Sequence, residues 1–362
     1  MGPDPIPKLL KKNHWTIAQT ARVRVPERAP ANYSTAYFLT KDRSLPARKL
    51  LHTTVFAQCF SPCGKYLAAA NNYGKIAIFS LSTALSPEGS EATWKPIFSF
   101  QASEDGAIFT LSSTDALLIS AGNGPICAWK WADILAKGPK LIWSLNIPKK
   151  GPFSNPEVNT LQIDEQESQT YVLAGCGDKN IYGWDISSGK QIFQLSGHTD
   201  YIHDLAVKKN NSLYASASED GTVRLWGRCG CVRPELGSWL GCVAIESNDD
   251  WLVCGGGPRM SVWHLRSMSC TTVLDTPKAT MKTVQFYEDS IISAGSQPFV
   301  HHWFMNGEQK AKVPCSPTSV FNIAVNTKSE NHRVLCVGGN SSKIDVSTNF
   351  GYKAFSLTFT LD

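Results

Sequence analysis

A pattern of short β-type segments recurs along this chain and constrains its fold more than any other feature. Each copy starts with alternating apolar and polar residues. After a polar turn comes an apolar run ending in small residues, and after a tight turn a β-rich run ends at a large apolar side chain. Such alternation, bounded by Gly, Asn, Asp and Ser, is typical of strands joined by turns. The closing positions are Phe79, Trp129, Trp184, Trp226, Trp263, Trp303 and Val346.

The spacing of these seven positions predicts a ring of sheets. The intervals are 50, 55, 42, 37, 40 and 43 residues, and one blade of a β-propeller takes about 40–45 residues. The two long intervals hold insertions. Residues 82–95 are rich in Ser, Pro and Glu, and residues 132–157 contain a short helical segment at 132–137 and a Pro/Gly-rich loop. We therefore expect an all-β fold, a seven-bladed β-propeller over residues 51–360.

Outer strands are expected after six of the seven closing positions, at residues 97–100, 141–147, 191–195, 271–274, 310–313 and 352–359. None is evident after Trp226, where residues 228–237 have no strand pattern. Either that edge strand is degenerate or the repeat changes phase there. The last unit has to close against the first, because radial repetition is what protects the sheet edges. The C-terminal strand at 352–359 is therefore predicted to be essential for stability.

Charge is distributed unevenly between the predicted propeller and the segment before it. Residues 1–50 hold ten Lys and Arg against three acidic residues, whereas the remainder holds 25 basic and 27 acidic residues. This distribution argues against a uniformly basic domain that binds nucleic acid. Residues 1–50 are also rich in Pro, which favours a flexible tail. The alternatives are electrostatic contact with RNA or an acidic partner, or a nuclear import signal.

The cysteines and the hydropathy pattern indicate a cytosolic or nuclear protein. Several of the eleven cysteines lie in apolar strand-like runs, among them Cys59, Cys127, Cys254 and Cys336. No secretory signal opens the chain, so we expect reduced thiols in the core. No run of 18 apolar residues exists, and no membrane partner is expected.

Residues 191–226 form the clearest copy of the pattern. They contain Gly197-His198 before the second strand, a turn at Glu219-Asp220-Gly221, and a closing Trp226. This unit resembles the WD40 repeat, although Gly227 stands where the family has Asp. The resemblance implies a WD40-type propeller with a hydrogen-bonded set in which the Asp fixes the His and the His fixes the Ser and the Trp. Its members here are His198, Ser216, Asp220 and Trp226.

Three patterns invite a catalytic or ligand-binding interpretation, and we favour a structural one for each. A Ser, His and Asp together suggest a hydrolase, but no Gly-x-Ser-x-Gly elbow surrounds Ser216. The glycine clusters at 175–177 and 255–257 precede no helix that could bind phosphate. Cys229 and Cys231 have the wrong spacing for a structural zinc site, even with His264 or His301-His302. We expect no catalytic residue, metal, cofactor or small-molecule substrate.

Longer sequence segments point to one particular family of WD40-repeat proteins. They are SPCGK (61–65), NNYGKIAIFSL (71–81), GHTDYIH (197–203), CGGGP (254–258), WHLR (263–266) and NFGYKAFSL (349–357). In this order they are similar to the THO complex subunit 6 family over residues 53–357, while the N-terminal 47 residues are not. The resemblance implies a nuclear scaffold subunit found in nuclear speckles, with shuttling to the cytoplasm. It also implies partners: other THO subunits, and the RNA helicase and export adaptor of the TREX assembly, which couples transcription and splicing to mRNA export.

Two alternative functions remain open. Substrate receptors of cullin-type ubiquitin ligases often carry Trp-Asp-x-Arg at a blade end, and Trp263-His264-Leu265-Arg266 is close to it. Arg266 would then contact the ligase adaptor. The second alternative is direct RNA binding. It is disfavoured by the slightly acidic body, so we expect any contact with RNA to be indirect or to involve residues 1–50.

Overall fold

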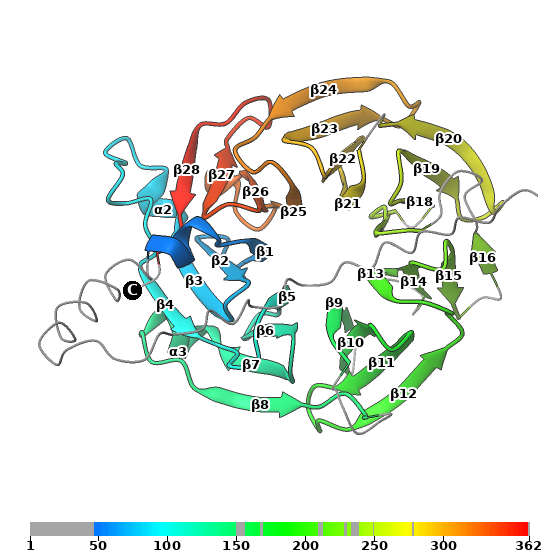
Figure 1. The fold of residues 1–362 in the computed structure, drawn as a ribbon, viewed down its shortest axis with the longest axis horizontal. Helices are drawn as coiled ribbons and strands as arrows, with labels where there is room; N and C mark the ends of the chain where they lie inside the picture. The colour runs from blue at the N-terminus through cyan, green and yellow to red at the C-terminus, as the bar shows by residue number, and fades with distance from the viewer. Residues whose placement is uncertain are drawn as a thin grey trace, which may run out of the picture. The chain divides into compact units, whose positions relative to one another are not determined.

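The chain folds into seven four-stranded antiparallel sheets arranged in a ring (Figure 1). The computed structural model describes residues 47–149, 156–166, 169–208, 213–227, 230–232, 239–248, 250–276 and 279–360, and Pro46–Asp362 form one compact unit. This confirms the predicted all-β, seven-bladed propeller. The predicted basic segment 1–50 lies outside the described residues except for its last four, so its flexibility stays a prediction.

Each sheet is built from four strands that follow one another in the sequence. Sheets one to three are β1–β4 (Val55–Phe60, Tyr66–Asn71, Lys75–Ser80, Phe98–Gln101), β5–β8 (Ile108–Ser113, Leu117–Gly122, Ile126–Lys130, Leu141–Leu145) and β9–β12 (Val158–Glu165, Thr170–Cys176, Asn180–Asp185, Gln191–Ser196). Sheets four and five are β13–β16 (Ile202–Lys208, Leu213–Ser218, Val223–Trp226, Gly230–Val232) and β17–β20 (Cys242–Ile245, Trp251–Gly255, Arg259–His264, Ser269–Asp275). Sheets six and seven are β21–β24 (Met281–Tyr287, Ser290–Gly295, Phe299–Phe304, Gln309–Pro314) and β25–β28 (Val320–Val325, Leu335–Gly339, Lys343–Ser347, Phe355–Thr358).

The first strand of each sheet lies innermost and contacts the first strands of its neighbours (Figure 1). Because the strands are antiparallel, the turns fall on two faces. We call the face with the second-to-third-strand turns and the sheet-to-sheet connections the upper face. The lower face carries the first-to-second and third-to-fourth connections. These two faces present the loops that a binding protein would use.

Seven apolar clusters fill the seven junctions between neighbouring sheets. The middle strands are buried on both faces: β11, β14 and β22 are buried along their whole length. This explains the runs ending in small residues, as in Leu213–Ser218, because Ala and Ser let two sheets approach closely. At about 25 cal/mol per Å² of apolar area buried, these layers supply most of the stabilising free energy.

Within the described ranges, the first and last sheets are each built from consecutive strands, so the ring closes without exchange of a strand between its ends. Asn326 of the last sheet donates from Nδ2 to the carbonyl of Gly64 at 2.7 Å, and the backbone N–H of Thr358 donates to the carbonyl of Trp94 at 2.9 Å. The rings of Trp94 and Phe355 stack with centroids 5.2 Å apart. The first and last sheets are therefore joined by side chains and loops, consistent with the importance predicted for the C-terminal strand.

The outer strands and insertions largely match the predictions. The last outer strand, however, covers only Phe355–Thr358, because residues 348–352 form a bend and residues 353–354 are irregular. Helix α3 (Trp131–Leu135) is the helical segment predicted at 132–137, and α2 (Leu81–Ala84) opens the first insertion. Among the described residues, no helix is long and apolar enough to cross a membrane.

The fourth sheet does have an outer strand, and it is the degenerate one. β16 covers three residues, Gly230–Val232, and pairs with β15 in register. The sequence gives the reason: Gly230 is a weak strand former, and Pro234 has no N–H to donate to a ladder. The phase of the repeat is therefore unchanged at this sheet.

The cysteines predicted to be buried thiols lie in strands. Cys59, Cys127, Cys254 and Cys336 belong to β1, β7, β18 and β26, and none of the four forms a disulfide. Burial raises the pKa of Cys127 to about 11 and that of Cys254 to about 12. Both thiols are therefore protonated at neutral pH and have little nucleophilic character.

Candidate functional site

The four residues of the predicted hydrogen-bonded set come together at the junction of sheets three and four. His198 lies in the connection between β12 and β13, and its Nδ1 is 2.8 Å from Oδ2 of Asp220. Its Nε2 is 2.7 Å from Oγ of Ser216. The indole Nε1 of Trp226 donates to the same Ser216 oxygen at 2.8 Å. One chain of bonds thus ties the connection between two sheets to β14 and β15.

The donors and acceptors of this set fit one arrangement of hydrogens. Trp226 can only donate, so Ser216 accepts from it and donates its own hydrogen to Nε2 of His198. Nδ1 of His198 then carries the hydrogen and donates to Asp220. Burial lowers the pKa of His198, an effect that outweighs the opposing influence of Asp220. The ring is therefore neutral at pH 7, as this arrangement requires.

Asp220 is held as a carboxylate at the turn between β14 and β15. Burial alone would raise its pKa, but hydrogen bonds from Thr222, His198 and Thr199 lower the pKa of Asp220 to about 2. The hydroxyl and backbone N–H of Thr222 donate to Oδ1 at 2.6 and 2.9 Å. The turn also needs Gly221, whose φ of 77° lies in the left-handed region. This local chemistry places the carboxylate beneath His198.

The distances within this set are those of a hydrolase triad, but its surroundings differ. Ser216 is fully buried, with an exposed fraction of 0%. Its oxygen already accepts from Trp226 and its hydrogen is given to His198. A nucleophilic serine has to reach a substrate carbonyl, so this hydroxyl is not placed for attack. The arrangement positions the β12–β13 connection, which is the structural role the sequence favours.

Partial copies of the set occur in sheets three and six. Nε1 of Trp303 donates to Oγ of Ser293 at 3.0 Å within sheet six. Ser293 and Trp303 are ten residues apart, as are Ser216 and Trp226, so this spacing could have predicted the bond from the sequence. In sheet three, Asp178 accepts from the hydroxyl of Tyr182 at 2.7 Å.

A second polar centre, on the innermost strand of sheet four, was not predicted. Asp204 on β13 accepts from the backbone N–H of Val243 at 2.9 Å and from the hydroxyl of Thr160 at 3.3 Å. It therefore connects the innermost strands of three sheets. Burial raises the pKa of Asp204 to about 7, although the hydrogen bonds from Val243, Leu205 and Thr160 favour the charged form. In the sequence, an Asp within an alternating strand suggests only a solvent-facing position.

The other candidate ligand sites form no cluster of ligand-binding groups in the described part of the chain. The glycine clusters at 175–177 and 255–257 lie where β10 and β18 end, in turns without a following helix. No group of three His, Cys, Asp or Glu side chains is placed to hold a metal ion among the described residues. Cys229 and the side chain of Cys231, considered above for zinc, lie outside those residues.

Arg266 lies on the lower face, directly after β19, and apart from the hydrogen-bonded set. Its side chain is 81% exposed, and Nη2 lies 3.5 Å from Oδ1 of Asp250. A weak ion pair in water at this exposure contributes little to stability. Arg266 is therefore available to a partner, as the alternative interpretation of the sequence requires.

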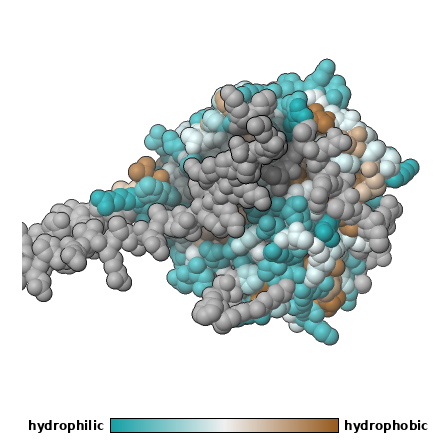
Figure 2. Space-filling model, turned by 45° about the vertical axis from the view of Figure 1, so that its right-hand side comes forward, coloured by the Kyte–Doolittle hydropathy of each residue, from teal (hydrophilic) through white to brown (hydrophobic). Residues whose placement is uncertain are grey.

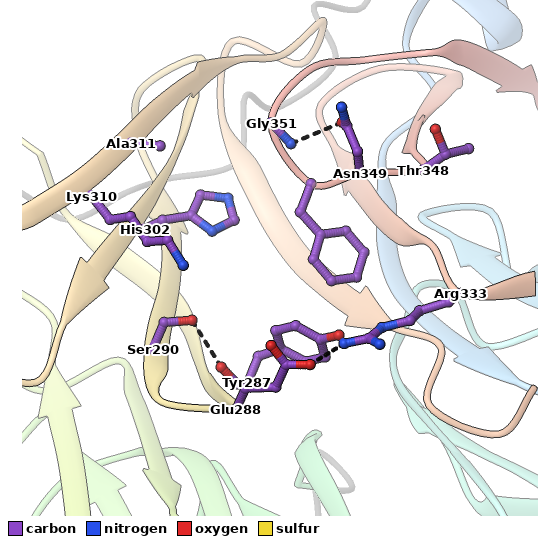
Figure 3. A pocket seen from close by; sticks show the side chains of 11 residues that line it. Tyr287, Glu288, Ser290, His302, Lys310, Ala311, Arg333, Thr348, Asn349 and Gly351 are labelled. Carbon is purple, nitrogen blue, oxygen red and sulfur yellow. Dashed lines mark hydrogen bonds and ion pairs between the residues drawn. The ribbon is translucent and has the colours of Figure 1, made fainter. Parts of the chain in front are cut away.

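A partner could bind at a patch or a hollow among the exposed side chains. Figure 2 shows a face on which hydrophilic residues predominate and apolar ones are scattered. A cavity between sheets six and seven on the lower face has a volume of about 470 Å³. Its lining includes Tyr287, His302, Lys310, Arg333 and Phe350 (Figure 3). That volume falls in the range of small-ligand sites, about 300–1,000 Å³.

Comparison with known proteins identifies both the repeat and whole-chain relatives. The family model "WD domain, G-beta repeat" matches residues 189–227, the copy that was clearest in the sequence. THO complex subunit 6 homolog of Danio rerio is 46% identical over 325 residues, covering 86% of this chain and 99% of the relative. THO complex subunit 6 of Homo sapiens is 44% identical, covering 86% and 95%.

Among solved structures, the WD40 β-propeller domain of Doa1 is similar in fold. The TM-score is 0.64 at 15% sequence identity, with 81% of this chain and 92% of that chain covered. At this identity the similarity concerns the fold alone.

Proposed function

The chain belongs to the THO complex subunit 6 family, and on that premise we propose that it is a non-catalytic scaffold subunit of the THO part of the TREX assembly. It would couple transcription and splicing to nuclear mRNA export through contacts with other proteins. The observation that carries this proposal is the similarity to the Danio rerio relative, which extends over 99% of that relative's length.

The fold is suited to such a role. A closed ring with a packed cluster at each junction keeps two faces of loops in fixed positions, so partners meet a preorganised surface. The hydrogen-bonded set around Ser216 is buried and used for structure. Binding surfaces in this proposal are therefore the loops and pockets of the faces, and no reaction step is assigned to the chain.

The proposed partners are other THO subunits, together with the RNA helicase and the export adaptor of TREX. We place the protein in the nucleus, in nuclear speckles, with shuttling to the cytoplasm. Contact with RNA is proposed to be indirect, because residues 51–362 hold 25 basic and 27 acidic side chains. Affinity for nucleic acid depends mainly on neutralising phosphates with Lys and Arg.

Affinity purification from nuclei under mild salt tests this proposal. The tagged full-length protein should retain the other THO subunits in stoichiometric amounts. Their absence from the purified material, with the bait folded and nuclear, would contradict it.

The ligase-receptor alternative is tested by one exposed side chain. Arg266→Glu should abolish binding to a cullin-ligase adaptor if that function is correct. Arg259→Glu is the matched control, because Arg259 lies at the opposite end of β19 on the upper face and its side chain is 45% exposed. Absence of adaptor binding, or binding that survives Arg266→Glu, removes the alternative.

A further inference from the structure

The cavity between sheets six and seven contains a buried imidazole nitrogen that has no hydrogen-bond partner among the described residues. His302 on β23 is 7% exposed, and its Nε2 has no hydrogen-bond partner among the described residues. Its imidazole points into the cavity (Figure 3), whose lining also includes Phe350. The hydroxyl of Tyr287, which also lines the cavity, is likewise buried without a partner in the part of the chain described. Buried polar atoms left unpaired are rare and costly, so they indicate a ligand or ordered water.

The charges around the cavity favour an anion. Lys310 on β24 lines it and is paired with no acidic residue within the described ranges. Arg333 is the second cation, but Glu288 forms an ion pair with it, and its guanidinium lies 5.2 Å from the centre of the Tyr287 ring. One positive charge is therefore left uncompensated. Burial, followed by the nearby Lys310 ammonium, lowers the pKa of His302, so its ring is a neutral donor or acceptor.

The apolar part of the cavity limits what the anion is attached to. The rings of Tyr287 and Phe350 meet edge to face with centroids 4.8 Å apart, and Ala311 completes this wall. Phe350 is held at a φ of 62° and Glu288 at 49°. Non-glycine residues in this left-handed region persist where the surroundings enforce them, often at binding sites.

From these observations we propose that the cavity receives an acidic side chain from a segment of a partner protein. The carboxylate accepts from Nε2–H of His302 and lies near the Lys310 ammonium, while the aliphatic stem contacts Phe350 and Ala311. This inference rests on the proposed function, because it assigns one of the contacts a scaffold subunit would make.

A carboxylate fits better than a phosphate. Phosphorylated side chains carry nearly two charges and are typically bound by clusters of Arg that make bidentate contacts. Here the one arginine is already engaged by Glu288. A single lysine and a neutral imidazole match a single negative charge.

The test uses the full-length protein and an array of overlapping peptides covering the other THO subunits. Bound peptides should share a Glu or Asp, and changing that residue to Gln or Asn should weaken binding about tenfold or more, as expected for a charged contact in a partly buried site. Lys310→Glu should have the same effect. The matched control is Lys312→Glu, two residues further along β24 and outside the cavity lining, which should change binding less than about twofold.

His302→Phe removes the imidazole nitrogen proposed to contact the carboxylate and should weaken peptide binding. Thermal unfolding checks that this variant folds. If that variant does not fold, Lys310→Glu decides alone, because Lys310 is exposed. Binding that ignores Lys310→Glu, that needs no acidic residue, or that requires phosphorylated peptides overturns the proposal. A cavity holding only water gives no dependence on either side chain, and also overturns it.

The nuclear purification separates this inference from the proposed function. If the wild-type protein retains THO subunits but Lys310→Glu binds peptides normally, only the cavity assignment fails. If the wild-type protein retains none of them, the proposed function fails. Acidic peptides bound through Lys310 would then still support the chemistry of the cavity.

Discussion

Removal of one buried hydroxyl, in Ser216→Ala, should destabilise the propeller by a predictable amount. The change leaves Nε2 of His198 without a donor and Nε1 of Trp226 without an acceptor. An unsatisfied buried polar group costs about 1–3 kcal/mol. The side chain of His198 is 0% exposed, whereas Trp226 is partly exposed and can turn to water. We therefore expect a loss of about 2–4 kcal/mol in the free energy of unfolding.

The control comes from sheet six. Ser293 has the same ten-residue separation from its tryptophan, and the described bond to its Oγ comes from Trp303 alone. Ser293→Ala should therefore cost less, about 1–2 kcal/mol. Urea unfolding followed by circular dichroism measures both variants and avoids a signal from tryptophans next to the mutation. A loss below about 0.5 kcal/mol for Ser216→Ala, the usual range of surface changes, would refute the reasoning. So would a larger loss for Ser293→Ala.

Three further predictions concern pH, ring closure and reactivity. Asp204 has a pKa of about 7 against an ordinary 3.8, so the folded state binds the extra proton. Between about pH 5 and 7 the wild-type protein should lose stability relative to Asp204→Asn as pH rises, by at most about 1.4 kcal/mol per pH unit. Urea unfolding at several pH values measures this, and a difference in unfolding free energy between the two proteins that does not change with pH would contradict it. Phe359→Ala, at a residue 0% exposed in the cluster that joins the first and last sheets, should cost about 3–5 kcal/mol in thermal or urea unfolding. The control Phe304→Ala, at a residue 43% exposed, should cost less than about 1 kcal/mol. Equal losses for the two variants would contradict the importance of the cluster between the first and last sheets. A fluorophosphonate probe should leave Ser216 unlabelled in the folded protein because its hydroxyl is buried; mass spectrometry that finds the label there would contradict a structural role.

The repeat made the architecture predictable from the sequence. Packing sheets face to face produces three patterns in the sequence. They are a two-residue alternation, small residues in strands buried on both faces, and a large apolar side chain near the end of the third strand of each sheet. The hydrogen-bonded set of His198, Ser216, Asp220 and Trp226 was predicted from the resemblance of residues 191–226 to the WD40 repeat. Ser293 and Trp303 have the same ten-residue separation as Ser216 and Trp226 and make the same bond.

The cavity between sheets six and seven could not be predicted in this way. Its lining comes from loops and strands at 287–288, 290, 302, 310–311, 333 and 348–351. The lining comes from two different sheets, and two of its residues, Phe350 and Glu288, have left-handed conformations that neither side chain prefers. Asp204 was missed for a related reason: its surroundings come from neighbouring sheets, through Val243 and Thr160. Contacts across junctions depend on the ring, whereas the pattern in the sequence describes single sheets.

Crosslinking mass spectrometry of the complex purified from nuclei tests the central claim, that this propeller is a binding platform within THO. Lysines on its faces, Lys310 among them, should crosslink to other THO subunits, and those to Lys310 should involve segments containing Glu or Asp. Crosslinks only within the chain, or only to proteins outside the complex, would contradict the account.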